Sequence, residues 1–305
     1  MDYDLYHDES KEGGYWHGML LIPCNKRKSF LNFLKEIRGI TKYTHPVCFK
    51  GLNSRGNKFD CNRAWLSLGT NALMQYFKNE TTSVLVNETK KYVKSVGVKT
   101  SYREILKIDS DKKIIGAKFI LFKDRDNHKK MGDYYSDHAA KIETTFSIGL
   151  KGGLHWLGDD NNPINIKSIH FDGYEHYRRK INKARVIGRI KGLRDYCSIE
   201  ENIEDATSDH TKGNCQKYED CQFLQLTDLL VGGFRTILGE EKNLIQGEIS
   251  FPLRELVNKW KGGYKRMQNS RWYKGFWLSE CWIEDGDWKF GDFKISNNKQ
   301  LNTLF

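Results

Sequence analysis

The sequence has little proline and no long apolar run. Its 305 residues include 4 prolines, and no stretch rich in proline or serine separates two parts of the chain, which favours one elaborated domain over two. No run of about 18 apolar residues occurs, so the sequence predicts no membrane-spanning helix. The opening MDYDLYHDES is polar and acidic, unlike a secretory signal. We therefore expect a cytoplasmic protein that has no membrane partner.

Several motifs of catalysis and metal binding are also missing. The 7 cysteines include no C-x-x-C pair, which argues against a zinc ribbon. Their odd number, without a secretory signal, predicts reduced and mostly buried thiols. The chain has no G-x-x-x-x-G-K-[ST], no H-E-x-x-H, no G-x-S-x-G, and no strand followed by G-x-G-x-x-G. Enzymes that depend on those motifs are therefore excluded.

Positive charge is what the sequence has in excess. It carries 50 Lys and Arg against 39 Asp and Glu, a formal net charge of +11. A basic excess favours a polyanionic partner such as nucleic acid. The alternative is a chain from a lysine-rich proteome, in which surface lysine is simply common. The sum of the charges does not choose between the two, so their positions matter more.

Apolar periodicity predicts an α/β fold with a mixed central sheet flanked by helices. At 38% hydrophobic residues the chain can bury a sizeable core. Strands are expected at 3–7, 15–22, 114–122 and 165–172, with an edge strand near Ala206. Helices are expected at 29–38, 60–77, 134–150 and 223–238. The first two strands would form a hairpin across Gly13-Gly14, and the strand at 114–122 would return from a second hairpin that starts at Lys107.

Three acids stand where such a fold would bring them together. Asp8 and Asp172 end two of the expected strands. Asp228 lies in an apolar helix, where a carboxylate is costly unless it is paired or bound to a metal. Gln225 precedes Asp228 by three residues and shares its helical face. Acids at strand ends are also ordinary turn formers, and Asp228 could form a local salt bridge, but the three together favour a functional site.

Converging carboxylates are the ligands that Mg²⁺ or Mn²⁺ prefers. Two such ions about 4 Å apart can activate a water molecule and stabilise the leaving oxygen of a phosphodiester. The sequence therefore predicts a site for two Mg²⁺ or Mn²⁺ ions, held by Asp8, Asp172 and Asp228.

Two segments resemble the motifs of a known family. HDES at 7–10, followed by an apolar strand, resembles the D-E-S opening of the family called domain of unknown function 3800. LQLTDLLVGG at 224–233 resembles the closing Q-L-A-D-L-L-A-G signature of that family. The resemblance implies an RNase H-like domain over residues 1–240, with helical and hairpin insertions at about 25–105. It also implies a metal-dependent nuclease, often encoded near phage-defence or mobile-element genes.

The resemblance assigns roles to individual residues. Asp8 matches the acid of the first strand and Asp228 the acid of the helix. Glu9 and Gln225 match accompanying motif positions and are counted with the catalytic residues. Asp172 matches by topology alone, as the acid that ends a central strand after a long helix.

Other positions depart from the family pattern or extend it. Lys11 replaces the usual glycine after D-E-S, and could contact phosphate or indicate a decayed site. RNase H-like sites commonly add an acid from the intervening helix, for which Glu143 is the candidate. The alternative is a partly solvated glutamate beside Lys141. His210 could act as a base or a phosphate contact, or could simply face solvent.

A basic run follows Asp172 directly. Residues 178–194 contain eight Lys or Arg and no acid, which favours contacts with phosphates over an ordinary solvated face. The candidate nucleic-acid contacts are Lys11, Arg178, Arg179, Lys180, Lys183, Arg185 and Arg189.

The tail at 241–305 lies outside the resemblance and is rich in tryptophan, lysine and arginine. Aromatic side chains among cations can stack on unpaired bases, or can close a small core or a subunit contact. We expect the tail to pack on the same domain, with a structural or oligomeric role for its tryptophans.

Two functions are therefore open. The first is a divalent-metal-dependent nuclease that hydrolyses DNA or RNA. The second is a catalytically inactive nucleic-acid-binding or assembly subunit that keeps the fold. A homo-oligomer or an accessory protein partner is compatible with both.

Overall fold

A computed structural model of the chain describes residues 1–11, 13–74, 116–125, 138–161, 163–172, 182–190, 195–200, 202–211, 218–240, 243–254, 257 and 275–293. The helices are α1 (Arg27–Thr41), α2 (Asn57–Met74), α5 (His138–Leu157), α7 (Lys183–Ile190), α8 (Tyr218–Arg235) and α9 (Leu244–Ser250). The strands are β1 (Asp2–Ser10), β2 (Tyr15–Pro23), β3 (Lys118–Asp124), β4 (Ile164–Asp172), β5 (Cys197–Ile199), β6 (Ile203–Ala206), β7 (Phe276–Glu284) and β8 (Asp287–Asp292).

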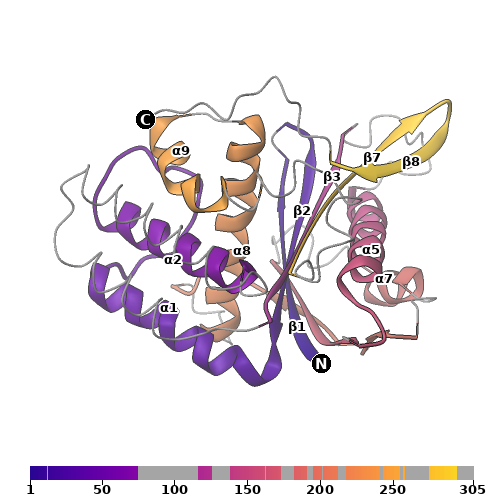
Figure 1. Cartoon of the computed structure of the whole chain (residues 1–305), viewed down its shortest axis with the longest axis horizontal. Helices are drawn as coiled ribbons and strands as arrows, with labels where there is room; N and C mark the ends of the chain where they lie inside the picture. The colour runs from indigo at the N-terminus through magenta and orange to yellow at the C-terminus, as the bar shows by residue number, and fades with distance from the viewer. Residues whose placement is uncertain are drawn as a thin grey trace.

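The strands form one curled mixed sheet flanked by helices (Figure 1). Its order is β5-β4-β1-β2-β3-β7-β8, and β6 also pairs with β4. The strands β1, β2 and β3 are antiparallel neighbours, whereas β4 runs parallel to β1. The expected α/β class with a mixed sheet is therefore confirmed.

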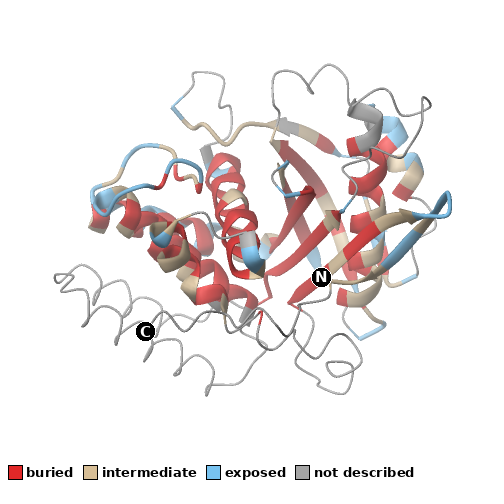
Figure 2. Cartoon of the chain, turned by 90° about the horizontal axis from the view of Figure 1, so that it is seen from above, coloured by how far each residue is buried: buried red, intermediate tan, exposed pale blue. Residues whose placement is uncertain are grey.

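Helices cover both faces of this sheet. In Figure 1, α1, α2, α8 and α9 lie on one side of the strands, and α5 and α7 lie on the other. Close approach depends on glycine: a Cβ on Gly153 of α5 would collide with Ile120 of β3. Figure 2 shows that α8 is buried along most of its length, between the sheet and the outer helices. An apolar helix is stable in such a place because it can bury every side.

The structure moves several of the expected boundaries. The first strand continues to Ser10, so Asp8 lies inside β1 and does not end it. The helix expected at 223–238 begins five residues earlier, at Tyr218. Both edges of β3 pair, with β2 and with β7, while the first arm of the hairpin expected from Lys107 lies outside the described residues.

The tail contributes to the central sheet and does more than pack on it. The strand β7 runs parallel to β3, and β8 pairs antiparallel with β7. Periodicity gave no strand here, because aromatic residues occur at both alternating positions of the tail. The basic residues of the tail between 259 and 271 lie outside the described residues.

The cysteines differ in state. Cys221 is disulfide-bonded, which corrects the expectation that all thiols are reduced. Five other cysteines of the described chain are free: Cys24, Cys48, Cys61, Cys197 and Cys281. Among the helices that the structure describes, none has the length and apolarity that a bilayer crossing requires.

Candidate functional site

The parallel pairing of β1 with β4 brings Asp8 and Asp172 together at one end of the sheet. His7 pairs with Phe171, so the next residue of each strand is one of the two acids. Successive side chains of a strand point to opposite faces. His7 packs against Phe146 of α5, and Asp8 therefore faces the opposite layer, which contains α8.

Helix α8 approaches this end of the sheet because a glycine lies beneath it. Gly18 of β2 pairs with Asp8. A Cβ on Gly18 would collide with Cγ2 of Val231, so a larger residue would hold α8 away from β2. Asp228 lies three residues before Val231, on the same side of the helix. The close packing of α8 on β2 thus places the third acid beside the strand acids.

The three acids line one cavity of about 740 Å³, together with Glu9 and Lys11. All three are half-buried. The backbone N–H of Ser208 donates to Oδ1 of Asp172 at 3.1 Å. The structure therefore brings together five of the residues that the sequence singled out.

Burial and mutual repulsion make this group of acids costly when it is ionised. Burial raises the pKa of Asp8 well above its usual value, and the charges of Asp228 and Asp172 raise it further. Burial also raises the pKa of Asp228 to about 6, and the Asp172 charge adds to this effect. A bound cation would relieve the repulsion, since hard carboxylate oxygens are the donors that Mg²⁺ and Mn²⁺ take.

Two groups that stabilise the ionised form of Asp228 were missed by sequence reasoning. The backbone N–H of Phe49 donates to Oδ2 of Asp228 at 2.7 Å, and Arg235 lowers the pKa of this acid by its charge. Arg235 lines the cavity and donates to Oγ of Ser10 at 2.6 Å. The seven-residue spacing between Asp228 and Arg235, about two helical turns, is the signal that could have found the arginine.

Gln225 does not line the cavity, but it forms hydrogen bonds with the loops around it. Its Oε1 accepts from the backbone N–H of Val47 at 2.9 Å and from Nη2 of Arg38 at 2.6 Å. Its Nε2 donates to the carbonyl oxygen of Ser208 and to Nδ1 of His210. Because Val47 belongs to one loop, and Ser208 and His210 to another, Gln225 is a positioning residue.

His210 shares in this bracing. Its Nε2 donates to the carbonyl oxygen of Thr44 at 2.9 Å, and its Nδ1 accepts from Gln225 at 2.9 Å. Both ring nitrogens are thus used in loop contacts. Burial lowers the pKa of His210, which favours the neutral ring that this pair of contacts requires.

Glu9 and Lys11 lie at the margin of the cavity. The hydroxyl of Tyr15 donates to Oε2 of Glu9, and Nζ of Lys11 lies 3.8 Å from Oε1 of Glu9. The lysine side chain is about half exposed, at 52%. Ion pairs with such exposure are weak, so Lys11 can turn toward a phosphate in the cavity.

Glu143 is not brought to the cavity. It is buried on α5, which lies on the other face of the sheet from α8. Its Oε2 lies 3.1 Å from Nε of Arg185 and 3.9 Å from Nη1 of Arg189, and its Oε1 accepts from the backbone N–H of Asn182 at 2.7 Å. Neither the solvated glutamate nor the site acid weighed from the sequence describes this buried carboxylate, which is paired with two partly exposed arginines.

The basic run is therefore only partly a surface for phosphate. The charges of Arg185 and Arg189 neutralise Glu143, although the Arg185 side chain is 44% exposed. Lys183 lies at the start of α7. The other candidate contacts, at 178–180, lie outside the described residues.

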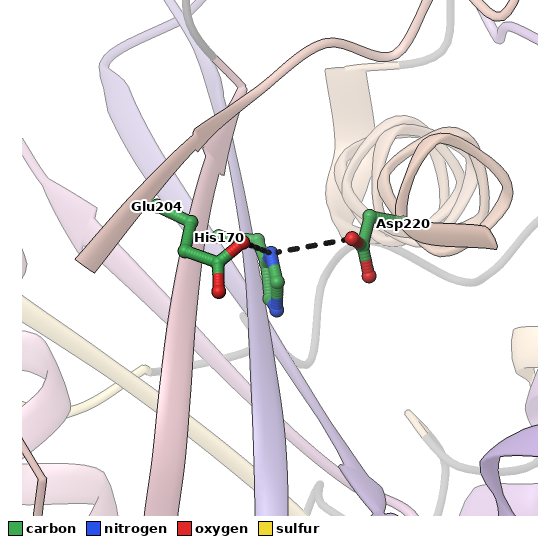
Figure 3. A group of neighbouring side chains, drawn as sticks. All are labelled: His170, Glu204 and Asp220. Atoms are coloured by element: carbon green, nitrogen blue, oxygen red, sulfur yellow. Dashed lines mark ion pairs between the residues drawn. The ribbon is translucent and has the colours of Figure 1, made fainter. Parts of the chain in front are cut away.

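A second polar group lies deeper along the same strands. His170, Glu204 and Asp220 are neighbours that could hold a metal ion (Figure 3), with ligand atoms within 4.8 Å of one another. Sequence reasoning missed this group. The spacing of His170 two residues before Asp172, and of Asp220 eight residues before Asp228, was the available signal.

Comparison with known proteins adds no relative. No family model, curated protein or solved structure matches the chain. The family resemblance of the two motifs therefore stays a prediction.

Proposed function

We propose that the chain is a divalent-metal-dependent nuclease with an RNase H-like core. The observation that carries this proposal is the convergence of Asp8, Asp172 and Asp228 on one cavity, where burial and mutual charge raise the pKa of Asp8 and of Asp228. Such a group of carboxylates is unfavourable when no cation is bound, because the negative charges are partly buried and repel one another. Shifted pKa values of this kind are typical of functional sites.

The donor set fits Mg²⁺ or Mn²⁺. Asp8, Asp172 and Asp228 offer only hard oxygen atoms, and about 740 Å³ of cavity leaves room for ions with water ligands. When bound, such ions activate water and stabilise negative charge on phosphate oxygens. Backbone N–H groups orient the carboxylates that would hold the ions: that of Ser208 fixes Asp172, and that of Phe49 fixes Asp228.

Cations around the acids support a polyanionic substrate. Lys11, Lys50 and Arg235 line the same cavity as the three acids. A phosphate group that entered would meet these charges, while the acids would hold the metal that its oxygens contact. The proposed substrate is therefore the phosphodiester backbone of DNA or RNA.

The alternative is a nucleic-acid-binding or assembly subunit without catalysis. Lys11 favours it in part, because a cation within 3.8 Å of Glu9 reduces the negative potential that attracts a metal. The two functions differ in whether the protein cleaves nucleic acid when metal ions are present.

The experiment is cleavage of end-labelled single- and double-stranded DNA and RNA with Mg²⁺, with Mn²⁺ or with EDTA. We expect metal-dependent products from the wild type and at least about a hundredfold slower cleavage by Asp228→Asn, since even outer partners of a metal ligand contribute 10- to 100-fold. Asp160→Asn is the matched control, because Asp160 is exposed and is not among the cavity-lining residues. Binding that weakens with salt, without any product, would favour the alternative.

A further inference from the structure

Three ligand atoms from three different elements converge at the first turn of α8. Nδ1 of His170 lies 3.8 Å from Oδ2 of Asp220 and 3.9 Å from Oε2 of Glu204. His170 and Asp220 are each 1% exposed, and Nδ1 and Oδ2 are buried without a hydrogen-bond partner. These separations are too long for hydrogen bonds. They suit ligands of one ion, because bonds of about 2.0–2.2 Å place neighbouring ligand atoms roughly 3–4 Å apart.

The hydrogen bonds around His170 fix which nitrogen carries the proton. The hydroxyl of Ser168 donates to Oδ1 of Asp4 at 2.6 Å. The same hydroxyl oxygen lies 2.8 Å from Nε2 of His170, and it must accept there because its only proton is already used. Nε2 is therefore the protonated nitrogen, and Nδ1 presents a lone pair. Burial lowers the pKa of His170, which favours this neutral ring.

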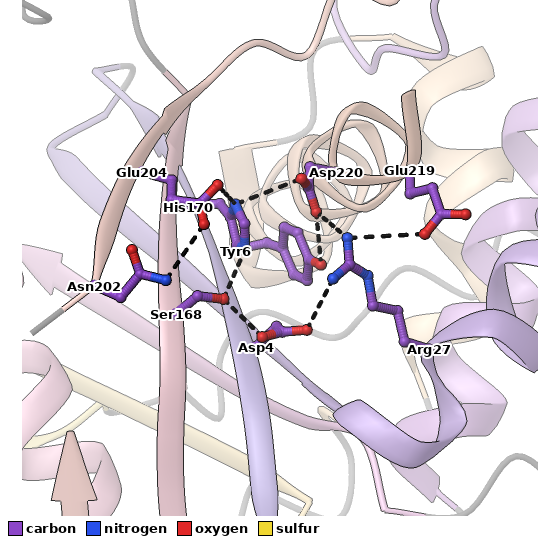
Figure 4. A network of polar contacts seen from close by, with 9 residues as sticks. All are labelled: Asp4, Tyr6, Arg27, Ser168, His170, Asn202, Glu204, Glu219 and Asp220. Atoms are coloured by element: carbon purple, nitrogen blue, oxygen red, sulfur yellow. Dashed lines mark hydrogen bonds and ion pairs between the residues drawn. The ribbon is translucent and has the colours of Figure 1, made fainter. Parts of the chain in front are cut away.

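The lone pair of Nδ1 faces other acceptors (Figure 4). A neutral imidazole nitrogen and a carboxylate oxygen both accept hydrogen bonds, so neither satisfies the other. Leaving two such atoms buried and opposed is costly. A cation between them satisfies both.

Outer contacts hold each carboxylate so that one oxygen is directed inward. Oδ1 of Asp220 accepts from Tyr6 at 3.1 Å and from Nη2 of Arg27 at 2.6 Å, which leaves Oδ2 toward His170. Nδ2 of Asn202 donates to Oε1 of Glu204 at 3.3 Å, so that Oε2 lies toward His170. Partners of this kind are typical of metal ligands, whose second atoms are usually fixed by hydrogen bonds.

We propose that His170, Glu204 and Asp220 bind one divalent first-row transition metal, with Zn²⁺ as the ion of choice. One imidazole nitrogen with two carboxylate oxygens suits Zn²⁺ better than Mg²⁺ or Ca²⁺, which prefer oxygen alone. The charges agree, because the one guanidinium of Arg27 lies within 4 Å of three carboxylates, those of Asp4, Glu219 and Asp220. The ion joins β4 and β6 to the first turn of α8, and so fixes the helix that carries Asp228. Glu204, with 27% of its side chain exposed, gives the ion access.

The test uses a variant that lacks acids of the carboxylate cavity, which is the cavity lined by Asp8, Asp172 and Asp228. Asp8→Asn with Asp228→Asn removes two of the three acids that the proposed nuclease site needs, so a failure of that site does not affect the result. In this background we expect one Zn²⁺ per chain by calorimetry, and zinc X-ray absorption with one imidazole nitrogen and otherwise oxygen ligands.

Two substitutions in the same background locate the ion. His170→Asn should abolish Zn²⁺ binding, and Glu204→Gln should weaken it at least tenfold. The glutamine keeps an oxygen that accepts from Asn202, so this variant decides the question if His170→Asn fails to fold. His155→Asn is the matched control, because His155 is a partly buried histidine of α5 that contacts Tyr196.

The proposal is overturned by any of three results. The first is the absence of Zn²⁺ binding by the doubly substituted chain. The second is unchanged binding by Glu204→Gln. The third is sulfur among the ligands, which would assign the ion to a cysteine.

Discussion

The carboxylate cavity should make the protein less stable at neutral pH than a variant that lacks one acid. The pKa of Asp228 is raised from 3.8 to about 6 in the folded chain. The folded state therefore binds more protons than the unfolded state between these two values, so the free energy of unfolding falls as the pH rises through this window. At 1.36 kcal/mol for each pH unit, the full loss above pH 6 is at most about 3 kcal/mol.

Asp228→Asn removes this penalty while it keeps an oxygen that can accept from the backbone N–H of Phe49. In EDTA at pH 8 we expect the variant to be more stable than the wild type by up to about 3 kcal/mol, and at pH 5 by roughly half of that. Urea unfolding at both pH values measures the difference. The exposed control Asp160→Asn should match the wild type at both.

The result that refutes this reasoning is specific. If Asp228→Asn is less stable than the wild type at pH 8 in EDTA, the carboxylate is a structural partner and not a strained ligand. Mg²⁺ provides a second check, because a ligand that binds only the folded state raises stability. It should stabilise the wild type, and it should stabilise Asp228→Asn much less.

Three further variants test the construction of the site. Gly18→Ala places a Cβ against Val231 and should lower the free energy of unfolding by about 1–3 kcal/mol and slow cleavage. The control Gly39→Ala, whose Cβ would have nothing within 4 Å, should lower neither the free energy of unfolding nor the cleavage rate. Equal behaviour of the two variants would contradict the close packing of α8. Gln225→Ala should lower the free energy of unfolding in urea by about 1–3 kcal/mol, because the buried N–H of Val47 loses its acceptor. An unchanged free energy of unfolding would show that Gln225 does not hold the loops in place. Glu143→Gln should leave the cleavage rate unchanged and lower the free energy of unfolding by less than about 1 kcal/mol, because its partner Arg185 is 44% exposed. Loss of cleavage would show that Glu143 acts at the catalytic site.

The sequence predicted the parts of the fold that depend on local pattern. The strand expected at 165–172 alternates clearly and forms at Ile164–Asp172, and the apolar segment that contains Asp228 forms the helix Tyr218–Arg235. The strands of the tail were missed, because the pairing of β7 with β3 joins segments about 150 residues apart and leaves no local signal.

The same distinction separates the site residues. Asp228 could be found because a carboxylate within an apolar helix is visible in the sequence itself, and Asp8 because it follows an expected strand and lies in the D-E-S segment. The role of Gln225 and the ion pair of Glu143 could not, since they depend on which loop or helix packs opposite. Glu143 shows the risk most clearly: its helix was expected correctly, but the partner of its buried face is α7.

The two polar groups follow from one geometrical fact about α8. Its acids Asp220 and Asp228 are eight residues apart, which is about two turns or roughly 12 Å along the axis. On β4, His170 and Asp172 are two residues apart and point to the same face, roughly 7 Å apart along the strand. The helix and strand therefore meet twice, once at each acid.

The ends of this contact differ in ligand chemistry. At Asp228 only oxygens converge around an open cavity, whereas at Asp220 an imidazole nitrogen joins them in a nearly closed setting. An open set of oxygens suits an exchangeable Mg²⁺ or Mn²⁺ that takes substrate oxygens. A buried set of ligands that includes an imidazole nitrogen suits a permanently bound structural ion. If both proposals hold, removal of zinc should loosen the first turn of α8 and thereby weaken Mg²⁺ binding at Asp228, while mutation of Asp228 should leave zinc binding intact.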